Sequence, residues 1–348
     1  MALNEELAAY ARDRGVDFIG VTTVAPLSPG RRGKEADPVA LMPGARSLVV
    51  AGIGTHVREC CLPPEPGRPR GRFGPWTRVE RPAVAYMCQV VPRFFHERGY
   101  QAQATAELPD KAAAVRAGWG LYGKNTIIHA EGAGSYLNIL TVLTDAPLEA
   151  VEQPLERSDC GECEECVRAC PTGALAEPYH LRADRCICDW LWGSPIPREL
   201  RPTVGNHLHR CSFCQDVCPK NRSLRPRTSL PFALDGPTPT PELIPLLGGT
   251  EELLRASLPS FVMTAGAETI RRNVALALGN VGDPVAVPAL AEALADPSAR
   301  VREYAAWALG EIGGSAARTA LAGGLPEESE PSVREEIAAA LDQAERGR

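Results

Sequence analysis

Seven cysteines of this chain fall into two blocks, with an eighth between them, and their spacing is typical of thiolate ligands to iron. The first block ends at a proline, Pro171, and its cysteines are Cys160, Cys163, Cys166 and Cys170. The second block ends at Pro219; its cysteines are Cys211, Cys214 and Cys218, and Cys186 stands between the blocks. C-x2-C-x2-C-x3-C-P is the bacterial two-cluster spacing, in which the fourth cysteine ligates the other cluster. The spacing predicts two [4Fe–4S] clusters and single-electron transfer.

Zinc is the alternative metal, since CxxC pairs also bind zinc. The threefold run ending in Cys-Pro, repeated in part downstream, favours cubane clusters. By the crossed rule, the first cluster takes Cys160, Cys163, Cys166 and Cys218. The second cluster takes Cys170, Cys211 and Cys214 and needs a fourth ligand, for which Cys186 and Cys188 compete.

Three cysteines remain outside both sets. Cys60 and Cys61 are adjacent in a proline-rich stretch, where they are either redox-active, placed against a cofactor, or ordinary free thiols. Cys88 sits in an apolar run and is expected in the core.

A protein that only carries electrons needs the cysteine region alone, yet about 150 residues precede it here. We therefore expect the clusters to feed a buried acceptor in the preceding domain. The glycine-dense stretch Arg116–Thr126 is a candidate for contact with that acceptor, because glycines let the backbone approach a cofactor closely. A plain turn is the alternative reading.

The elements that must position these residues follow from apolar periodicity. Residues 1–150 mix a helical pattern at Glu5–Arg14 with strand patterns at Phe18–Thr22, Ser47–Ala51 and Leu137–Leu143, which predicts an α/β domain with a central sheet. Residues 151–225 form the ferredoxin-like two-cluster domain, and residues 226–264 a proline-rich linker.

Residues 265–348 contain a repeat, so the expected fold is a mixed α/β and α+β chain that ends in α-repeats. The pattern at Arg271–Asp283 recurs at Val301–Gly314 and more weakly at Val333–Leu341, with offsets of 30 residues from Arg272 to Arg302 and 32 from Arg302 to Arg334. Helical periodicity at this spacing indicates HEAT-like repeats, which pack or bind rather than catalyse.

Composition narrows the protein class. The chain has 348 residues, a net charge of −6 and 44% hydrophobic residues, which fits a soluble protein of two or three domains. We expect no membrane contact and no secretory signal, and with CxxC-dense cysteines this predicts a cytoplasmic location.

Together these stretches resemble the epoxyqueuosine reductase family, which belongs with the cobalamin-dependent reductases that include reductive dehalogenases. The resemblance covers the chain nearly end to end, and its stretches are Met42–Val50, Arg116–Thr126, Gly132–Tyr136, Leu143–Glu149, Cys160–Leu175, Arg185–Ile187, Ile196–Asn206, Cys211–Asn221 and the repeat start at Ile270.

The resemblance implies cobalamin in the N-terminal domain next to one cluster, with its cobalt reduced through the clusters. In the family, reduced cobalt removes the epoxide oxygen of epoxyqueuosine in a tRNA anticodon and so makes queuosine. Lys124, Asn125 and Ile127 fall on the stretch that lines the corrin, and Cys186 falls on the family's single ligand between the blocks, which favours it over Cys188. The resemblance also implies an external electron donor of flavodoxin or ferredoxin type, and we expect a monomer.

Two stretches depart from the family pattern. The proton-donating Asp opens a motif D-[ST]-A-x-x-x-[ED]-[KR]-A, and Ala104 holds that position here. Alanine cannot donate a proton, and reduction at carbon needs a positioned acid. The replacement candidates are Glu107, Asp110, Tyr122 and His129. In addition, Arg72–Glu80 stands where the family has R-Y-A-x-G-x-D-Y-H.

Three functions therefore compete: reduction of a modified nucleoside in tRNA, the same chemistry on a small epoxide or organohalide, and non-catalytic electron transfer to a corrinoid partner. Residues 265–348 hold eight Arg and no Lys against thirteen Asp and Glu, a balance that disfavours a phosphate backbone. An arginine cluster with Phe73 and Trp76 offers an alternative grip for an anion or RNA, or is a solvated basic loop; its members are Arg68, Arg70, Arg72, Arg78 and Arg81.

Overall fold

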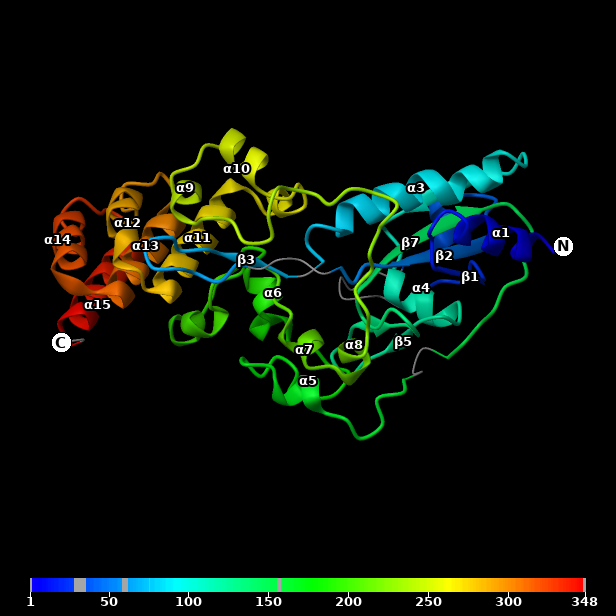
Figure 1. Cartoon of the computed structure of the whole chain (residues 1–348), viewed down its shortest axis with the longest axis horizontal. Helices are drawn as coiled ribbons and strands as arrows, with labels where there is room; N and C mark the ends of the chain where they lie inside the picture. Colours follow the sequence, from blue (N-terminus) through cyan, green and yellow to red (C-terminus); the bar gives the residue numbers. More distant parts are fainter. Residues whose placement is uncertain (1, 28–35, 58–61, 75, 155–157, 347–348) are drawn as a thin grey trace. The chain divides into compact units, whose positions relative to one another are not determined.

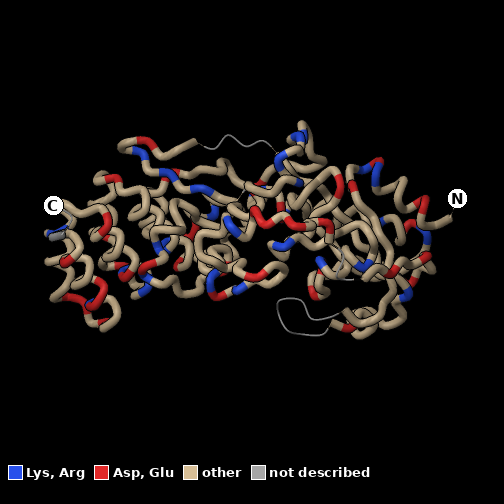
Figure 2. Tube along the Cα trace, turned by 90° about the horizontal axis from the view of Figure 1, so that it is seen from below, with Lys and Arg blue, Asp and Glu red and all other residues tan. Residues whose placement is uncertain are grey.

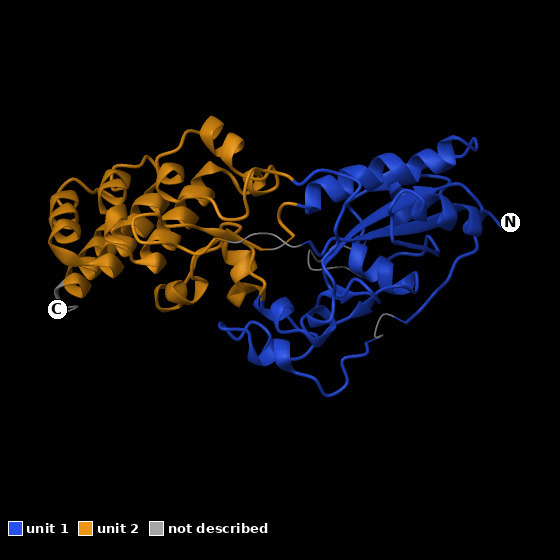
Figure 3. Ribbon diagram, in the orientation of Figure 1, with its two compact units in different colours: residues 1–58, 79–182, 213–234 blue, residues 59–78, 183–212, 235–348 orange. Residues whose placement is uncertain are grey.

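The computed structural model describes residues 2–27, 36–57, 62–74, 76–154 and 158–346 (Figure 1). The chain divides into two compact units (Figure 3). Unit 1 comprises residues 1–58, 79–182 and 213–234, and unit 2 comprises residues 59–78, 183–212 and 235–348. Parts of the predicted two-cluster region thus belong to each unit. The domain boundaries drawn from the sequence stay a prediction.

Unit 1 is built on a four-stranded antiparallel sheet in the order β1-β2-β7-β4. The expected strands are present, and two of them extend beyond the predicted ends. The bounds are β1 Phe18–Thr22, β2 Ser47–Gly54, β7 Leu137–Thr144 and β4 Ala102–Thr105.

Helices cover both faces of this sheet (Figure 1). Along β2, Val49 and Ala51 face helices α1 (Leu3–Arg12) and α3 (Glu80–His96), while Val50 faces helix α4 (Asp110–Arg116). Alternate strand residues point to opposite faces, so a continuous apolar run supplies two cores at once. The predicted α/β layering of this domain is confirmed.

The short elements of unit 1 carry the functional loops. These are α2 Pro38–Leu41, β5 Leu121–Tyr122, β6 Ile128–His129, α5 Glu165–Arg168, α7 Phe213–Asp216 and α8 Pro219–Arg222.

Unit 2 contains the helical repeats, which confirm the predicted HEAT-like pattern. Helix α13 (Ala299–Ile312) packs against α11 (Ala267–Val281) and α15 (Pro331–Arg346). Glycines make the close approach: a Cβ at Gly279 would lie 2.8 Å from the Cα of Ala308. The recurring Leu-Gly of the repeat is therefore a helix-packing position.

The remaining elements of unit 2 lie between the repeat helices or in the segments that precede them. They are β3 Arg72–Phe73, η1 Ala183–Arg185, α6 Ile187–Trp190, η2 Arg198–Val204, β8 His207–His209, α9 Ile244–Leu247, α10 Glu251–Ser257, η3 Val262–Ala265, η4 Pro284–Ala286, α12 Val287–Ala293 and α14 Gly314–Gly324, and β3 pairs in parallel with β8.

Within the described ranges, no helix combines the length and the apolar character that a membrane span requires.

Candidate functional site

The glycine-dense stretch forms a hairpin in unit 1. Strands β5 and β6 pair Tyr122 with Ile128, and the turn between them carries Lys124 and Asn125. The Asn125 Oδ1 accepts the Ile127 N–H at 3.2 Å. A Cβ at Gly123 would lie 2.6 Å from that same oxygen, so this glycine is required by the turn itself. Of the two interpretations of this stretch, the plain turn is enough to explain Gly123, and contact with a cofactor is not needed to account for it.

The turn forms one wall of a pocket in unit 1 that also contains all four thiols assigned to the first cluster. Lys124, Asn125, His129 and Ser135 line this pocket together with Cys160, Cys163, Cys166 and Cys218. We call it the thiol pocket. Cys163 is the exposed member of the set, while the other three thiols are partly buried.

The donor set of the thiol pocket fits an iron–sulfur cluster. Burial, followed by the neighbouring thiols Cys160, Cys218 and Cys163, raises the pKa of Cys166 to about 11. Thiolates gathered this closely repel one another unless a cation compensates them, and a bound metal deprotonates its thiol ligands outright. Four soft sulfur donors in one pocket match the ligand number of a [4Fe–4S] cluster.

A network of neutral side chains fixes the loop that closes the pocket. Asn221 Nδ2 donates to Ser135 Oγ at 2.8 Å and to the Gln215 carbonyl at 2.8 Å, and its Oδ1 accepts the Ser135 N–H at 2.8 Å. Gln215 Nε2 donates to Ser135 Oγ at 2.8 Å. Gly134 permits this approach, since its φ is +55° and a Cβ there would lie 2.2 Å from Asn221 Oδ1. The network joins the Gly-Ser loop to the segment that carries Cys214 and Cys218.

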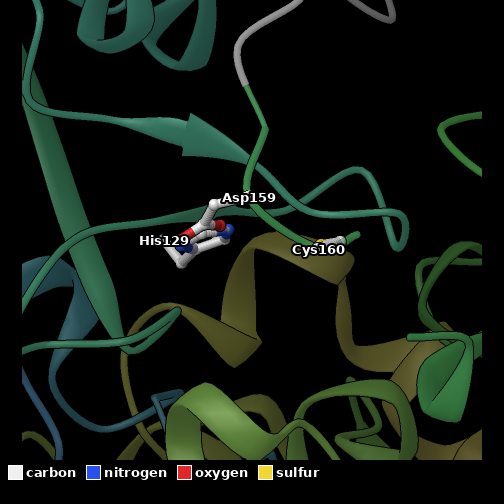
Figure 4. Close-up of side chains that lie close together, drawn as sticks. All are labelled: His129, Asp159 and Cys160. Carbon is white, nitrogen blue, oxygen red and sulfur yellow. Dashed lines mark ion pairs between the residues drawn. The ribbon is translucent and has the colours of Figure 1, made fainter. Parts of the chain in front are cut away.

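A charged group lies beside the pocket (Figure 4). His129 Nε2 is 3.0 Å from Asp159 Oδ1, and the Lys220 ammonium donates to the other oxygen of Asp159. Burial lowers the pKa of His129, against the raising effect of Asp159. Ligand atoms of His129, Asp159 and Cys160 lie within 4.8 Å of one another. His129 thus lies beside Cys160, a predicted cluster ligand, and contacts the Asp159 carboxylate.

Three cysteines of the second set lie in unit 2. Cys186 precedes helix α6, Cys188 lies within it, and Cys211 follows β8. The Cys188 Sγ is 3.9 Å from the Cys211 Sγ and accepts the Cys211 N–H at 3.4 Å. The choice between Cys186 and Cys188 as ligand stays a prediction, as do the remaining site assignments.

The candidate proton donors lie in different places. Ala104 lies in β4, partly buried, and its side chain packs against the apolar cluster under α1 and α3. Glu107 is exposed. Burial, with a smaller effect of Asp110, raises the pKa of Tyr122 to about 12. Asp110 therefore lies close to Tyr122, near the turn that carries Lys124.

Most of the arginine cluster is engaged within unit 2. Arg68 pairs with Glu242, and Arg70 Nη2 lies 3.0 Å from the same carboxylate. Arg78 donates to the carbonyls of residues 235 and 236. These three cations support the local chain. Cys60 and Cys61 fall outside the described residues, and Cys88 packs at the edge of the unit 1 core as expected.

Reasoning from the sequence assigned no role to five residues of the site: Ser135, Asp159, Gln215, Lys220 and Asn221. Ser135 stood in the G-A-G-S-Y stretch, while Gln215, Lys220 and Asn221 stood in the C-S-F-C-Q-D-V-C-P-K-N stretch. Polar residues within such stretches were the available signal. The contacts of Ser135 with Gln215 and with Asn221 span 80 and 86 residues of sequence, so no local pattern could pair them.

Family models match the two C-terminal parts of the chain. Residues 159–221 match a 4Fe–4S double cluster binding domain, and residues 261–342 match HEAT repeats. Fold and site thus define an iron–sulfur protein with two [4Fe–4S] clusters, a mixed α/β domain and HEAT repeats. The chain is 32% identical over 331 residues to the epoxyqueuosine reductase of Bacillus subtilis (strain 168), which covers 86% of this chain and 85% of the relative. The chain belongs to the epoxyqueuosine reductase family.

Other comparisons agree with this assignment. The chain is 40% identical to the epoxyqueuosine reductase of Escherichia coli (strain K12) over 180 residues, which are 51% of this chain and about half, 47%, of that relative. A crystal structure of epoxyqueuosine reductase with an epoxyqueuosine-modified tRNA-Tyr stem loop superposes with a TM-score of 0.88 at 30% identity, covering 99% of both chains. The B. subtilis enzyme structure gives a TM-score of 0.89 at 29% identity over 98% of each chain.

Proposed function

We propose that this chain is a reductase that converts epoxyqueuosine in tRNA to queuosine with electrons passed through two [4Fe–4S] clusters and cobalamin. The observation that carries the proposal is the thiol pocket: the turn that the resemblance assigns to the corrin, with Lys124 and Asn125, lines the same pocket as the four thiols assigned to the first cluster. An electron acceptor held at that turn would lie beside the first cluster.

The residues present fit such a cofactor. Lys124 and Asn125 are 8% and 7% exposed, so their polar groups are held in the wall of the pocket rather than spread in solvent. Cobalamin, when bound, would supply a redox-active cobalt centre for reduction of an electrophilic carbon. The turn supplies the polar contacts, with Asn125 Nδ2 also donating to the Cys214 carbonyl at 3.4 Å.

A tRNA substrate is supported by the likeness over the whole chain to a reductase solved with an epoxyqueuosine-modified tRNA stem loop. Acidic and basic residues are interspersed along the repeats of this chain, and the acidic ones are more numerous (Figure 2). Any contact of the repeats with phosphates would therefore rest on individual arginines rather than on a continuous basic surface.

The proton for the reduced carbon must come from a residue other than Ala104. Tyr122 and His129 both belong to the hairpin that carries Lys124. The pKa of Tyr122, raised by burial to about 12, leaves its phenol protonated at neutral pH, whereas burial lowers the pKa of His129 and so disfavours its protonated form. We propose that Tyr122 holds this proton at its Oη.

Anaerobic reconstitution of the full chain tests the proposal. We expect about eight iron and about one cobalt per chain, and conversion of epoxyqueuosine in a tRNA anticodon stem loop by the dithionite-reduced protein. Tyr122→Phe should lower turnover while iron and cobalt contents stay unchanged. Loaded protein that leaves the modified stem loop unchanged would contradict the tRNA assignment.

A second substrate class is favoured by one observation, the alanine at position 104 with its apolar surroundings. Loss of the family's donor at this place is compatible with the same reduction of a small epoxide or organohalide. Turnover of such a compound by protein that is inactive on tRNA would establish this alternative. The electron donor of flavodoxin or ferredoxin type, the monomeric state and the cytoplasmic location stay predictions.

A further inference from the structure

The thiol pocket is lined by a buried imidazole whose hydrogen bonding is not satisfied within the described part of the chain. His129 lines the pocket beside the cysteines and is 6% exposed. Its Nε2 atom is buried and has no hydrogen-bond partner among the described residues. A buried polar atom without a partner costs free energy, so we expect an acceptor for this ring in the pocket.

The nearby carboxylate of Asp159 does not satisfy this nitrogen. Its Oδ1 lies 3.0 Å from His129 Nε2 (Figure 4), but the contact lacks the geometry of a hydrogen bond. The Lys220 ammonium donates to the other oxygen, so Asp159 has a charged partner of its own. The carboxylate still favours the proton on Nε2, because a lone pair there would face its negative charge. His129 is therefore a donor with another acceptor, and the imidazolium would donate equally.

Ser135 supplies a second donor at the same pocket. Its Oγ accepts from Gln215 Nε2 and from Asn221 Nδ2, both at 2.8 Å. Both amide orientations are fixed, because Gln215 Nε2 also donates to the Ser135 carbonyl and Asn221 Oδ1 accepts the Ser135 N–H. Two accepted bonds occupy both lone pairs of the hydroxyl, which can then only donate. Ser135 is buried, and the described residues offer its proton no acceptor.

Sulfur atoms are the acceptors that this pocket gathers. The four thiols assigned to the first cluster line it, and the carboxylate of Glu165, which also lines it, pairs with Arg168. A ring nitrogen of His129 lies within 4.8 Å of the Cys160 sulfur. The donors and the four thiols all belong to unit 1. Hydrogen bonds to the sulfurs of an iron–sulfur cluster are one of the factors that set its reduction potential.

We propose that His129 donates a hydrogen bond to a sulfur atom of the first cluster and thereby raises the reduction potential of that cluster. Reduction adds one negative charge to the cluster, and a donor directed at its sulfurs stabilises the more negative form more strongly. Burial of the imidazole keeps water from replacing this bond. The inference rests on the first cluster and not on the tRNA substrate.

Substitutions at His129 separate hydrogen bonding from packing. His129→Leu removes the donor and keeps an apolar side chain in the pocket, while His129→Gln keeps an N–H donor. The matched control is His180→Leu, which alters an exposed histidine of the same unit beside Glu177. All variants are made in the full chain and reconstituted anaerobically with iron and sulfide. Both midpoint potentials are followed by electron paramagnetic resonance during titration with dithionite.

We expect His129→Leu to retain about eight iron per chain while one midpoint shifts to a more negative potential and the other does not move. The midpoint that moves should be the one that is missing from Cys218→Ala, which lacks a ligand of the first cluster. His129→Gln and His180→Leu should keep both midpoints close to those of the unaltered protein. Iron-loaded His129→Leu with both midpoints unchanged, or with only the other midpoint shifted, would overturn the proposal.

The Asp159→Asn protein shows whether the effect passes through the carboxylate. His129→Leu should shift the same midpoint in this background as well. No shift there would mean that His129 acts only on the charge of Asp159, and the proposal would fail.

If His129→Leu does not load iron, His129→Gln decides. A loaded Gln variant with both midpoints unchanged supports donation, while a negative shift or failure to load overturns it. Failure of the substrate assignment is distinguishable: protein that leaves the modified stem loop unchanged, while His129→Leu shifts the midpoint, would contradict the tRNA proposal alone.

Discussion

The two cysteine environments are held in place by different means. In unit 1, the loop that closes the thiol pocket is fixed by uncharged groups of Ser135, Gln215 and Asn221. In unit 2, the segments that carry Cys188 and Cys211 are fixed by a long repeat helix through a cation, Arg272, and an amide, Asn273. One site depends on a local polar network, and the other on the C-terminal repeats.

This difference bears on what the repeats do. A repeat module that only bound a partner would leave the cluster segments unaffected when altered. Here the start of the repeats supplies the hydrogen bonds that order those segments. The contrast also predicts that changes in the two units have separable effects on iron content, on potential and on pH dependence.

The largest effect is expected from loss of a ligand in the thiol pocket. Cys218→Ala should reduce the iron content from about eight to about four per chain, because a cubane that lacks one of four thiolates is poorly retained. Iron analysis and electron paramagnetic resonance measure this. Cys88→Ala, which alters a thiol outside both sets, should leave the iron content unchanged. Zinc in place of iron in the unaltered protein would contradict the ligand assignment.

The next largest effect on iron content is expected from loss of the fourth ligand of the second cluster, for which Cys186 and Cys188 are the candidates. Cys186→Ala should lose the second cluster, while Cys188→Ala should keep about eight iron, because Cys188 is then a neighbour of Cys211 rather than a ligand. The 3.9 Å between Cys188 and Cys211 sulfurs suits a hydrogen-bonded pair. The reverse outcome, with iron lost only from Cys188→Ala, would assign Cys188 as the ligand.

Much of the fold could be predicted from the sequence because the determining patterns are local. Apolar runs at Phe18–Thr22 and Leu137–Leu143 became strands of the sheet, and the Leu-Gly repeat became the packing positions of α11 and α13. The ligand spacing of Cys160 to Cys170 is likewise a local pattern.

The rest of the site depends on contacts between distant segments. Asn221 meets Ser135 across 86 residues, and Arg272 meets Trp190 across 82. The arginine-rich stretch was also ambiguous from sequence alone, since the partner of Arg68 and Arg70 is Glu242, far along the chain. Charge runs do not show which cations are already paired.

The neutral network of unit 1 should carry a measurable share of stability. Asn221→Ala leaves the Ser135 N–H and the Gln215 carbonyl without their partners in a buried place, and should lower the free energy of unfolding by about 3 kcal/mol. Chemical denaturation under anaerobic conditions measures this. The exposed Asn4 bonds the backbone of Glu149, and Asn4→Ala should cost less than about 1 kcal/mol. Equal effects of the two changes would show that the network is not a major constraint.

The pH dependence of stability should separate the two environments further. Burial, with a smaller effect of Arg72, lowers the pKa of His207 to about 4 from its usual 6.5, and His207 lies in the β8 strand of unit 2 that leads to Cys211. The unfolded chain binds a proton at this histidine below pH 6.5 and the folded chain does not. The free energy of unfolding should therefore fall between pH 6.5 and pH 4, by about 2 kcal/mol at pH 5. In His207→Gln this loss should shrink, whereas changing the exposed His180 to Gln should leave it intact.

Because Ser135, Gln215 and Asn221 do not titrate, Asn221→Ala should lower stability by the same amount at pH 7 and pH 5. A pH-dependent cost of Asn221→Ala would mean that the unit 1 network is coupled to a titrating group, and the contrast between the two environments would then fail.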